Sequence, residues 1–200
     1  MTASQDPSFD PRAIIAALER KRVTYVLIGG LARVLRGADE ITDGVDICPT
    51  FGRDNIDRLE RATSELDARR RDGQPLVWSE QAIDGDPVLA LSTQFGTLNI
   101  VGTPAGVPRG CVDLRHVATK EHLGYGLQPF VASAGDLARM AAALHRGQDV
   151  ARLPELRRIM ELETDREQTL APTVASPPLR ADRSRRLERE GPEHGPRLSH

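Results

Sequence analysis

Two glycines and a nearby carboxylate are the residues of this chain whose types and spacing best suit chemistry. Gly29 and Gly30 follow an almost continuous apolar run, 23–28, and open a predicted short helix to about Arg36. Without a Cβ atom, glycine NH groups at a helix start can approach phosphate oxygens closely. The same two residues also suit a tight turn after a buried strand. The sequence therefore allows both a phosphate cradle and a purely architectural turn.

Acidic residues lie in and beside the next predicted strand, 45–48. Asp46 lies within it, Asp43 precedes it, and Gly44 stands two residues before Asp46. Alternate residues of a strand share one face, so two carboxylates at this spacing could hold magnesium ions that bind a triphosphate. Here only Asp46 is placed for that task. Asp43 should point to the other face, and it could substitute only through a bulge or a bent strand end.

The other predicted elements position these residues in an α+β fold, a mixed β-sheet with packed helices and a C-terminal helical segment. A first helix runs from Pro11 to about Arg20 behind the N-cap Asp10, and Asp54 is expected to cap a long helix with an apolar stripe. Further short strands are predicted over 76–78, 88–92 and 97–101, an extended pair around 124–126, and helices from Ser133 to about 144 and from Pro154 to about 162.

Length and composition indicate one domain with an appendage. The chain has 200 residues, of which 39% are hydrophobic, which is enough for one core over residues 1–163. Residues 164–200 combine proline, arginine and glutamate with few large apolar side chains, so a disordered tail is expected. The net charge of -2 gives no overall footprint for nucleic acid, and any RNA contact must come from a local patch. Sequence-specific DNA binding is not expected.

Cysteine usage and hydropathy bear on the cellular compartment. Cys48 and Cys111 are far apart in the sequence and lack the spacing of a zinc site or a disulfide framework. Two reduced thiols are therefore expected. No apolar run approaches the length of a membrane span, and residues 1–10 are polar, unlike a signal sequence. We expect a cytoplasmic protein that does not bind membranes.

Several motifs together carry a family resemblance. From Tyr25 to about Met160, the chain resembles the minimal nucleotidyltransferases of the AbiEii and MenT toxin type. The matching motifs are Gly-Gly-Leu-Ala at 29–32, Gly37, the Thr-x-x-x-Asp-Ile-Cys-Pro spacing of 42–49, the strand and loop at 95–106, and the helical segment at 135–156. The resemblance implies a nucleotidyltransferase-like fold with Mg²⁺ and a nucleoside triphosphate as cofactors. It also implies a tRNA 3' end as acceptor and an antitoxin as protein partner.

The resemblance also assigns residue roles. It implies that the nucleotide is bound by Gly29, Gly30, Arg33, Thr42, Arg146 and Asp149, and that Asp46 binds the metal. Three departures fall on this site: Glu40 stands where arginine is common, Gly44 replaces the first metal aspartate, and Asn99 replaces the third acidic residue. Ala141 and Gln148 fill further positions that are basic in relatives. Since magnesium prefers charged oxygen ligands, these changes predict loss of tight two-metal binding.

Some polar residues have two interpretations. Thr42 could be the hydroxyl that an antitoxin phosphorylates in some toxins of this type, or a threonine that stabilises a turn, which we favour. Arg33, Arg36 and Arg139 could form a basic patch for triphosphate or RNA, although solvated arginines on helix surfaces are commoner.

Three hypotheses for function follow, in order of preference. The first is a nucleotidyltransferase-fold protein that is catalytically weakened or inactive and retains nucleotide or RNA binding. The second is an active enzyme that transfers a nucleoside monophosphate from a triphosphate to RNA. The third is a protein-binding module whose glycine turn is architectural.

Overall fold

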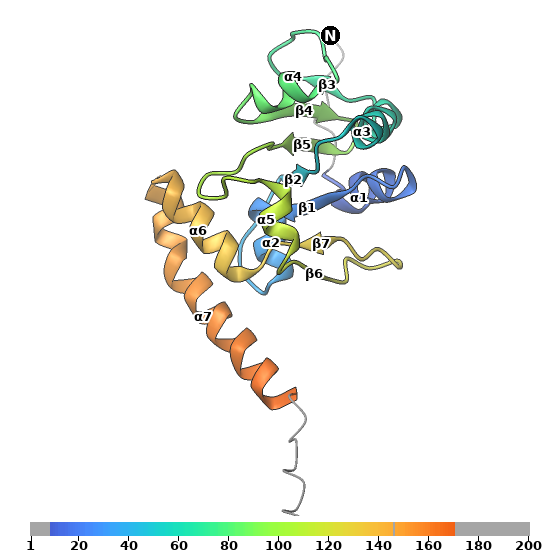
Figure 1. The fold of residues 1–200 in the computed structure, drawn as a ribbon. Helices are drawn as coiled ribbons and strands as arrows, with labels where there is room; N and C mark the ends of the chain where they lie inside the picture. Colours follow the sequence, from blue (N-terminus) through green and yellow to red (C-terminus); the bar gives the residue numbers. More distant parts are fainter. Residues whose placement is uncertain (1–8, 146, 171–200) are drawn as a thin grey trace, which may run out of the picture.

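Seven strands and seven helices make up residues 9–145 and 147–170, the part of the chain that the computed structural model describes (Figure 1). The strands are β1 (Tyr25–Ile28), β2 (Gly44–Pro49), β3 (Arg69–Arg70), β4 (Leu89–Thr93), β5 (Gly96–Ile100), β6 (Thr119–Lys120) and β7 (Phe130–Val131). The helices are α1 (Pro11–Arg20), α2 (Gly29–Leu35), α3 (Arg53–Glu65), α4 (Glu80–Asp84), α5 (Cys111–Arg115), α6 (Ala134–Leu144) and α7 (Gly147–Leu170).

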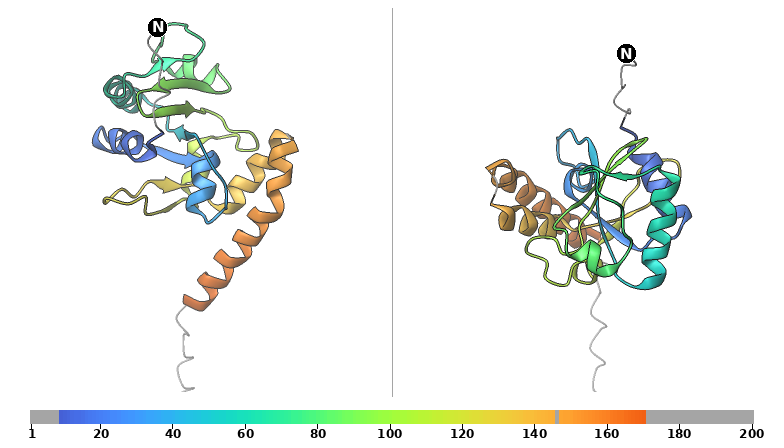
Figure 2. Two further views of the ribbon diagram at one scale, coloured as in Figure 1. Left: turned by 180° about the vertical axis from the view of Figure 1, so that it is seen from behind. Right: turned by 90° about the horizontal axis from the view of Figure 1, so that it is seen from above.

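All seven strands form one mixed sheet in the order β3-β4-β5-β2-β1-β7-β6. The central strand β2 pairs antiparallel with β1 and parallel with β5, while β1 pairs parallel with β7. The predicted α+β fold is therefore confirmed. Figure 2 shows that α6 and α7 lie together on one side of the molecule and α1 and α3 on the other. No helix of the described residues has the length and apolarity needed to cross a bilayer.

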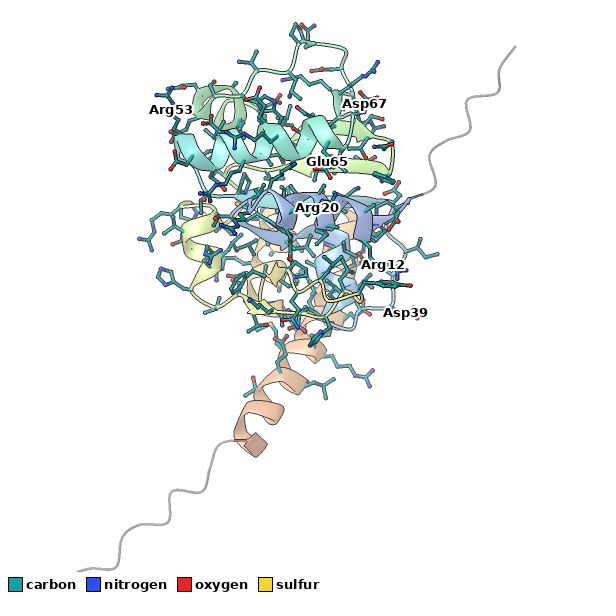
Figure 3. All side chains as sticks on the ribbon, turned by 90° about the vertical axis from the view of Figure 1, so that its right-hand side faces the viewer. Arg12, Arg20, Asp39, Arg53, Glu65 and Asp67 are labelled. Carbon is teal, nitrogen blue, oxygen red and sulfur yellow. The ribbon has the colours of Figure 1, made fainter. Side chains whose placement is uncertain are left out.

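The first helix forms as the sequence predicts. The Asp10 side chain accepts hydrogen bonds from the backbone NH groups of Arg12 and Ala13, which otherwise lack partners at a helix start. The apolar face of helix α1 is fully buried. On its outer side, an ion pair between Arg20 and Glu65 joins α1 to the end of α3 (Figure 3). These two helices pack against each other, α1 also contacts β2, and no residue of either helix lines the cleft described below.

Two local predictions are wrong, and one strand carries no sequence signal. Helix α3 begins at Arg53 with Gly52 as its N-cap, and Asp54 lies in the first turn without making a capping hydrogen bond. Residues 76–78 form no strand, because they lie in the loop between β3 and α4. The edge strand there is the short β3, whose two arginines provide no apolar pattern that could predict it.

The C-terminal helices also differ from the prediction at their boundaries. Ser133 caps α6 as expected, since its hydroxyl accepts the backbone NH of Asp136. Pro154 does not begin the last helix but lies inside α7, which starts at Gly147. The helix also continues to Leu170, past the expected end near 162 and into the segment predicted as a tail. Residues 171–200 lie outside the described residues.

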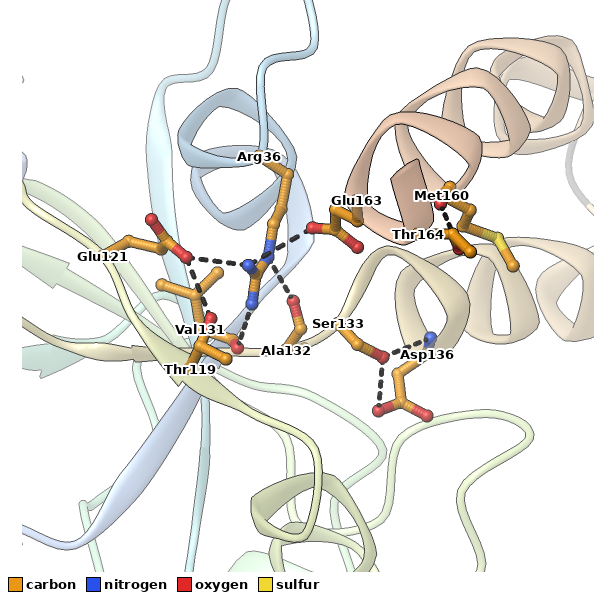
Figure 4. A network of polar contacts seen from close by, with 10 residues as sticks. All are labelled: Arg36, Thr119, Glu121, Val131, Ala132, Ser133, Asp136, Met160, Glu163 and Thr164. Carbon is orange, nitrogen blue, oxygen red and sulfur yellow. Dashed lines mark hydrogen bonds and ion pairs between the residues drawn. The ribbon is translucent and has the colours of Figure 1, made fainter. Parts of the chain in front are cut away.

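A buried arginine ties three parts of the fold together. The Arg36 guanidinium donates to the carbonyl oxygens of Val131 and Ala132 at 2.8 and 3.0 Å and pairs with Glu121 and Glu163 (Figure 4). Its side chain is only 8% exposed. Arg36 therefore belongs neither to a basic patch nor to a solvated surface, because its charge is used to hold α2 against β7 and α7.

The two cysteines, distant in sequence, meet in the interior. Both thiols are buried; Cys48 lies on β2, and Cys111 begins α5. The hydrogen bond between the two thiols and their burial raise the pKa of Cys48, and its Sγ lies 3.5 Å from the carbonyl oxygen of Gly102. Sequence spacing alone could not reveal this contact, because the crossover from β5 to α5 creates it.

Candidate functional site

A cleft of about 450 Å³ opens beside the C-terminal end of β1. Its lining comes from the β1–α2 junction, β2, helix α6 and the segments before β4 and after β5, with one residue from α7. Its lining residues are Ile28, Gly29, Gly30, Arg33, Asp46, Pro87, Val88, Val101, Thr103, Pro104, Ala105, Leu137, Met140, Ala141, Leu144 and Arg152. The structure therefore brings the two predicted glycines, Arg33 and Asp46 into one cavity.

The side chain of Asp46 leaves no room for a Cβ atom at Gly29. Gly29 has a positive φ of 68°, and a Cβ atom built on it would lie 2.0 Å from Oδ2 of Asp46. The carboxylate reaches this position because Asp46 is opposite Ile28 in the antiparallel pair of β1 and β2. The glycine turn thus has an architectural reason that does not depend on phosphate. The absence of a side chain at Gly29 also lets the Asp46 carboxylate lie directly against the Gly29 backbone beside the cleft.

Asp46 and Asn99 form the polar centre of the site. They are register partners in the parallel pair of β2 and β5, and Nδ2 of Asn99 donates to Oδ1 of Asp46 at 2.7 Å. The backbone NH of Gly30 also donates to the Asp46 carboxylate. Two donors therefore already engage the single carboxylate, and one comes from the residue that the resemblance places at a metal-binding position.

Gly44 lies on the same face of β2 as Asp46, two residues earlier. Its register partner is Thr97, and a Cβ atom at Gly44 would find only ordinary contacts, the nearest at 3.5 Å to Cβ of Thr97. Its backbone is not in the left-handed region. The site has room for a side chain that this chain does not carry.

The residues present do not fit a pair of magnesium ions. Among the side chains that the structure describes, no group of three or more His, Cys, Asp or Glu could hold a metal ion. Two-metal sites depend on several carboxylate oxygens. Asp46 offers one carboxylate, Gly44 offers nothing, and the Asn99 amide points its NH₂ group toward Asp46.

Burial raises the pKa of the Asp46 carboxyl above its ordinary value, against the opposing effects of the hydrogen bonds from Asn99 and Gly30 and of the Arg33 charge. The folded state therefore binds this proton more tightly than the unfolded chain. Stability from this group is present below the unfolded-state pKa, near 3.9, and is lost as the pH rises through the higher folded-state pKa.

An Asp46→Asn variant is accordingly expected to lose less stability than the unaltered chain as the pH rises from about 3.5 to 8. Urea unfolding across this pH range measures how the free energy of unfolding changes with pH. Asp39→Asn is the matched control, because Asp39 is exposed, does not line the cleft and is not among the groups that shift the Asp46 pKa. An unchanged slope in Asp46→Asn would contradict the raised pKa.

Asp43 and Thr42 lie at the entrance to β2. The exposed position of Asp43 does not support the suggestion that it substitutes for a ligand at Gly44. The Thr42 hydroxyl donates to the carbonyl oxygen of Gly44 at 3.1 Å, as a turn-stabilising threonine would. It also lies beside Gly30, where a Cβ atom would be 2.7 Å from Thr42 Oγ1.

An ion-pair cluster at the cleft wall has no counterpart among the sequence predictions. Nη2 of Arg33 binds Oε1 of Glu40 at 2.9 Å, and Nε of Arg152 lies 3.3 Å from Oε2 of the same carboxylate. Arg152 belongs to α7 and carries no motif signal, so only the helix packing reveals it. Arg139, a candidate for the basic patch, is on α6 and pairs with Asp136 at 2.7 Å.

The remaining predicted nucleotide-binding residues are only partly described. Arg146 lies outside the described residues. Asp149 belongs to α7, but its side chain lies outside the described part of the structure. Ala141, at a position where the resemblance implies lysine, contributes to the apolar lining of the cleft.

Comparisons with known proteins add little beyond the geometry. No protein-family model matches the sequence, and no curated protein matches it. Among solved structures, one from Thermotoga maritima, described as a suggested nucleotidyltransferase, aligns with 79% of this chain and 89% of its own. The two share 18% sequence identity, with a TM-score of 0.44.

Proposed function

We propose that this chain is a nucleotide-binding protein built like a nucleotidyltransferase of the AbiEii and MenT toxin type that does not carry out two-metal nucleotidyl transfer. The proposal depends on one observation: Asp46 is the only carboxylate among the described residues that line the cleft, and its partner across the sheet is an amide, Asn99, at 2.7 Å. A transfer reaction of the two-metal type needs anionic oxygens on both metals. The described part of this site lacks them.

Nucleotide binding is supported by the shape and lining of the cleft. Its apolar lining on α6 suits a base or ribose, while Arg33 and Gly30 supply polar groups to the same cleft. Sequence motifs at 29–32 and 42–49 support the same family. A tRNA 3' end as acceptor and an antitoxin as partner belong to the proposal only through this resemblance.

The test is incubation of the full chain with radiolabelled nucleoside triphosphates, magnesium and total RNA, beside a Gly44→Asp variant. We expect no label on RNA from the unaltered chain, and label from Gly44→Asp if this carboxylate suffices. Asp46→Ala added to Gly44→Asp is the control and should abolish labelling. Labelling of RNA by the unaltered chain would refute the proposal and favour an active enzyme.

Nucleotide binding is tested separately by thermal unfolding of the unaltered chain with ATP, AMP or adenosine. A ligand that binds the folded state raises the unfolding temperature. The absence of a shift with every nucleotide and nucleoside would favour a protein-binding module instead.

A further inference from the structure

The carboxylate of Glu40 binds both of the arginines that line the cleft. Nε and Nη2 of Arg33 donate to Glu40 at 2.9 to 3.2 Å, and Nε of Arg152 lies 3.3 Å from Oε2 of Glu40. The Glu40 side chain is 9% exposed and that of Arg33 is 12% exposed. Planar guanidinium groups bind carboxylate and phosphate with the same forked geometry. The interaction surface that a phosphate would use is therefore filled.

The Glu40 carboxylate also lies against the cleft backbone. A Cβ atom on Gly30 would be 3.0 Å from Oε1 of Glu40, so the carboxylate packs on this glycine directly. Gly30, Arg33 and Arg152 all line the cavity. An anionic group of a ligand that reached the two arginines here would have to displace Glu40.

Charge balance leads to the same conclusion. Among the described side chains, the charged ones that line the cleft are Arg33, Arg152 and Asp46, and Glu40 contacts both arginines. Two positive and two negative charges leave this wall with no excess positive charge when both carboxylates are ionised. A triphosphate brings several negative charges, and the residues present do not fit the metal pair that would offset them.

We infer that Glu40 is a specificity-determining residue that keeps polyphosphate out of this cleft. Its carboxylate occupies the anion-binding position formed by Arg33, Arg152 and Gly30, so a triphosphate cannot use these groups until Glu40 is displaced. A ligand that fills the apolar part of the cleft and leaves this position alone does not compete with Glu40. This inference rests on the proposed function only in placing a nucleotide in this cleft.

The test measures binding of sodium tripolyphosphate to the full chain by isothermal titration calorimetry in a metal-free buffer with chelator. Glu40→Gln should bind tripolyphosphate at least about tenfold more tightly than the unaltered chain, because it frees two guanidinium groups. Arg33→Gln added to Glu40→Gln should remove most of this gain. The matched control is Glu121→Gln, whose carboxylate pairs with Arg36 away from the cleft.

Folding of each variant is checked by circular dichroism. If Glu40→Gln does not fold, Glu40→Asp replaces it: the shorter side chain keeps the charge but cannot hold both arginines, and a gain in affinity is still expected. Tripolyphosphate binding by the unaltered chain as tight as by the Glu40 variant would overturn the inference. An equal gain in Glu121→Gln would also overturn it.

A parallel titration with ATP separates this inference from the proposed function. If Glu40→Gln gains affinity for tripolyphosphate but neither chain binds ATP, AMP or adenosine, the role of Glu40 stands and nucleotide binding fails. If the unaltered chain binds adenosine or AMP and Glu40→Gln gains nothing for tripolyphosphate or ATP, nucleotide binding stands and the role of Glu40 fails.

Discussion

Magnesium is expected to bind at least about tenfold more tightly to a chain carrying both Gly44→Asp and Asn99→Asp than to the unaltered chain. Residues 44 and 46 lie on one face of β2, and residue 99 is directly across from Asp46 on β5. The two substitutions would therefore place three carboxylates together. Without metal, their mutual repulsion should lower the stability of the variant. Magnesium should restore it, because the folded state alone assembles the site.

Thermal unfolding over a magnesium titration measures this effect. The unaltered chain should show little change, whereas the unfolding temperature of the double variant should rise steeply with magnesium concentration. A control that carries Gln74→Asp and Gln81→Asp adds the same charge at two exposed positions that do not line the cleft. An equal magnesium response in this control, or in the unaltered chain, would show that the absence of carboxylates at residues 44 and 99 is not what limits metal binding.

Gly29→Ala is expected to destabilise the fold by more than about 2 kcal/mol, because it combines backbone strain with a clash. The added methyl group would lie 2.0 Å from Oδ2 and 2.8 Å from Cβ of Asp46, a contact that no side-chain rotation of alanine can relieve. Either Asp46 must leave its hydrogen bonds or the β1–α2 turn must shift. Both outcomes disturb the cleft wall.

Urea unfolding compares this variant with Gly73→Ala. Gly73 has a similar φ of 74°, and no atom lies within 4 Å of the position that its Cβ atom would take, so this control reports the cost of a left-handed backbone alone, about 1 to 2 kcal/mol. The Gly29→Ala change is also introduced into an Asp46→Gly background, where most of its excess cost should disappear. If Gly29→Ala and Gly73→Ala lower the free energy of unfolding equally, the contact with Asp46 does not add to the cost of Gly29→Ala.

The cleft holds few of the charges that the family resemblance implies. Gly44 and Asn99 stand at the positions where the resemblance implies metal-binding carboxylates, and the Glu40 carboxylate binds Arg33 and Arg152. These two departures act on the net charge of the cleft in opposite directions. A single reversion is therefore expected to recover less than a combined one, since neighbouring charges do not act independently.

Local sequence signals located most elements near the site. Asp10 and Ser133 cap their helices as predicted, because a capping hydrogen bond is made within a few residues. The strand before Gly29 follows from an almost continuous apolar run, and the strand around Asp46 from the apolar residues on either side of that carboxylate. Signals failed where the element was short or polar, as for β3, or where neighbouring helices decided the outcome, as for Pro154 inside α7.

The sequence by itself determined the types of chemical group at the site: two adjacent glycines, one strand carboxylate at Asp46, and no acidic side chain at residues 44 and 99. These are properties of residue identity and of the two-residue repeat of a strand. Only the tertiary structure decided which groups meet. The contact of Asp46 with Gly29, the pairing of Arg152 with Glu40 and the meeting of Cys48 with Cys111 join segments far apart along the chain. Their physical cause is strand register and helix packing, which no local pattern encodes.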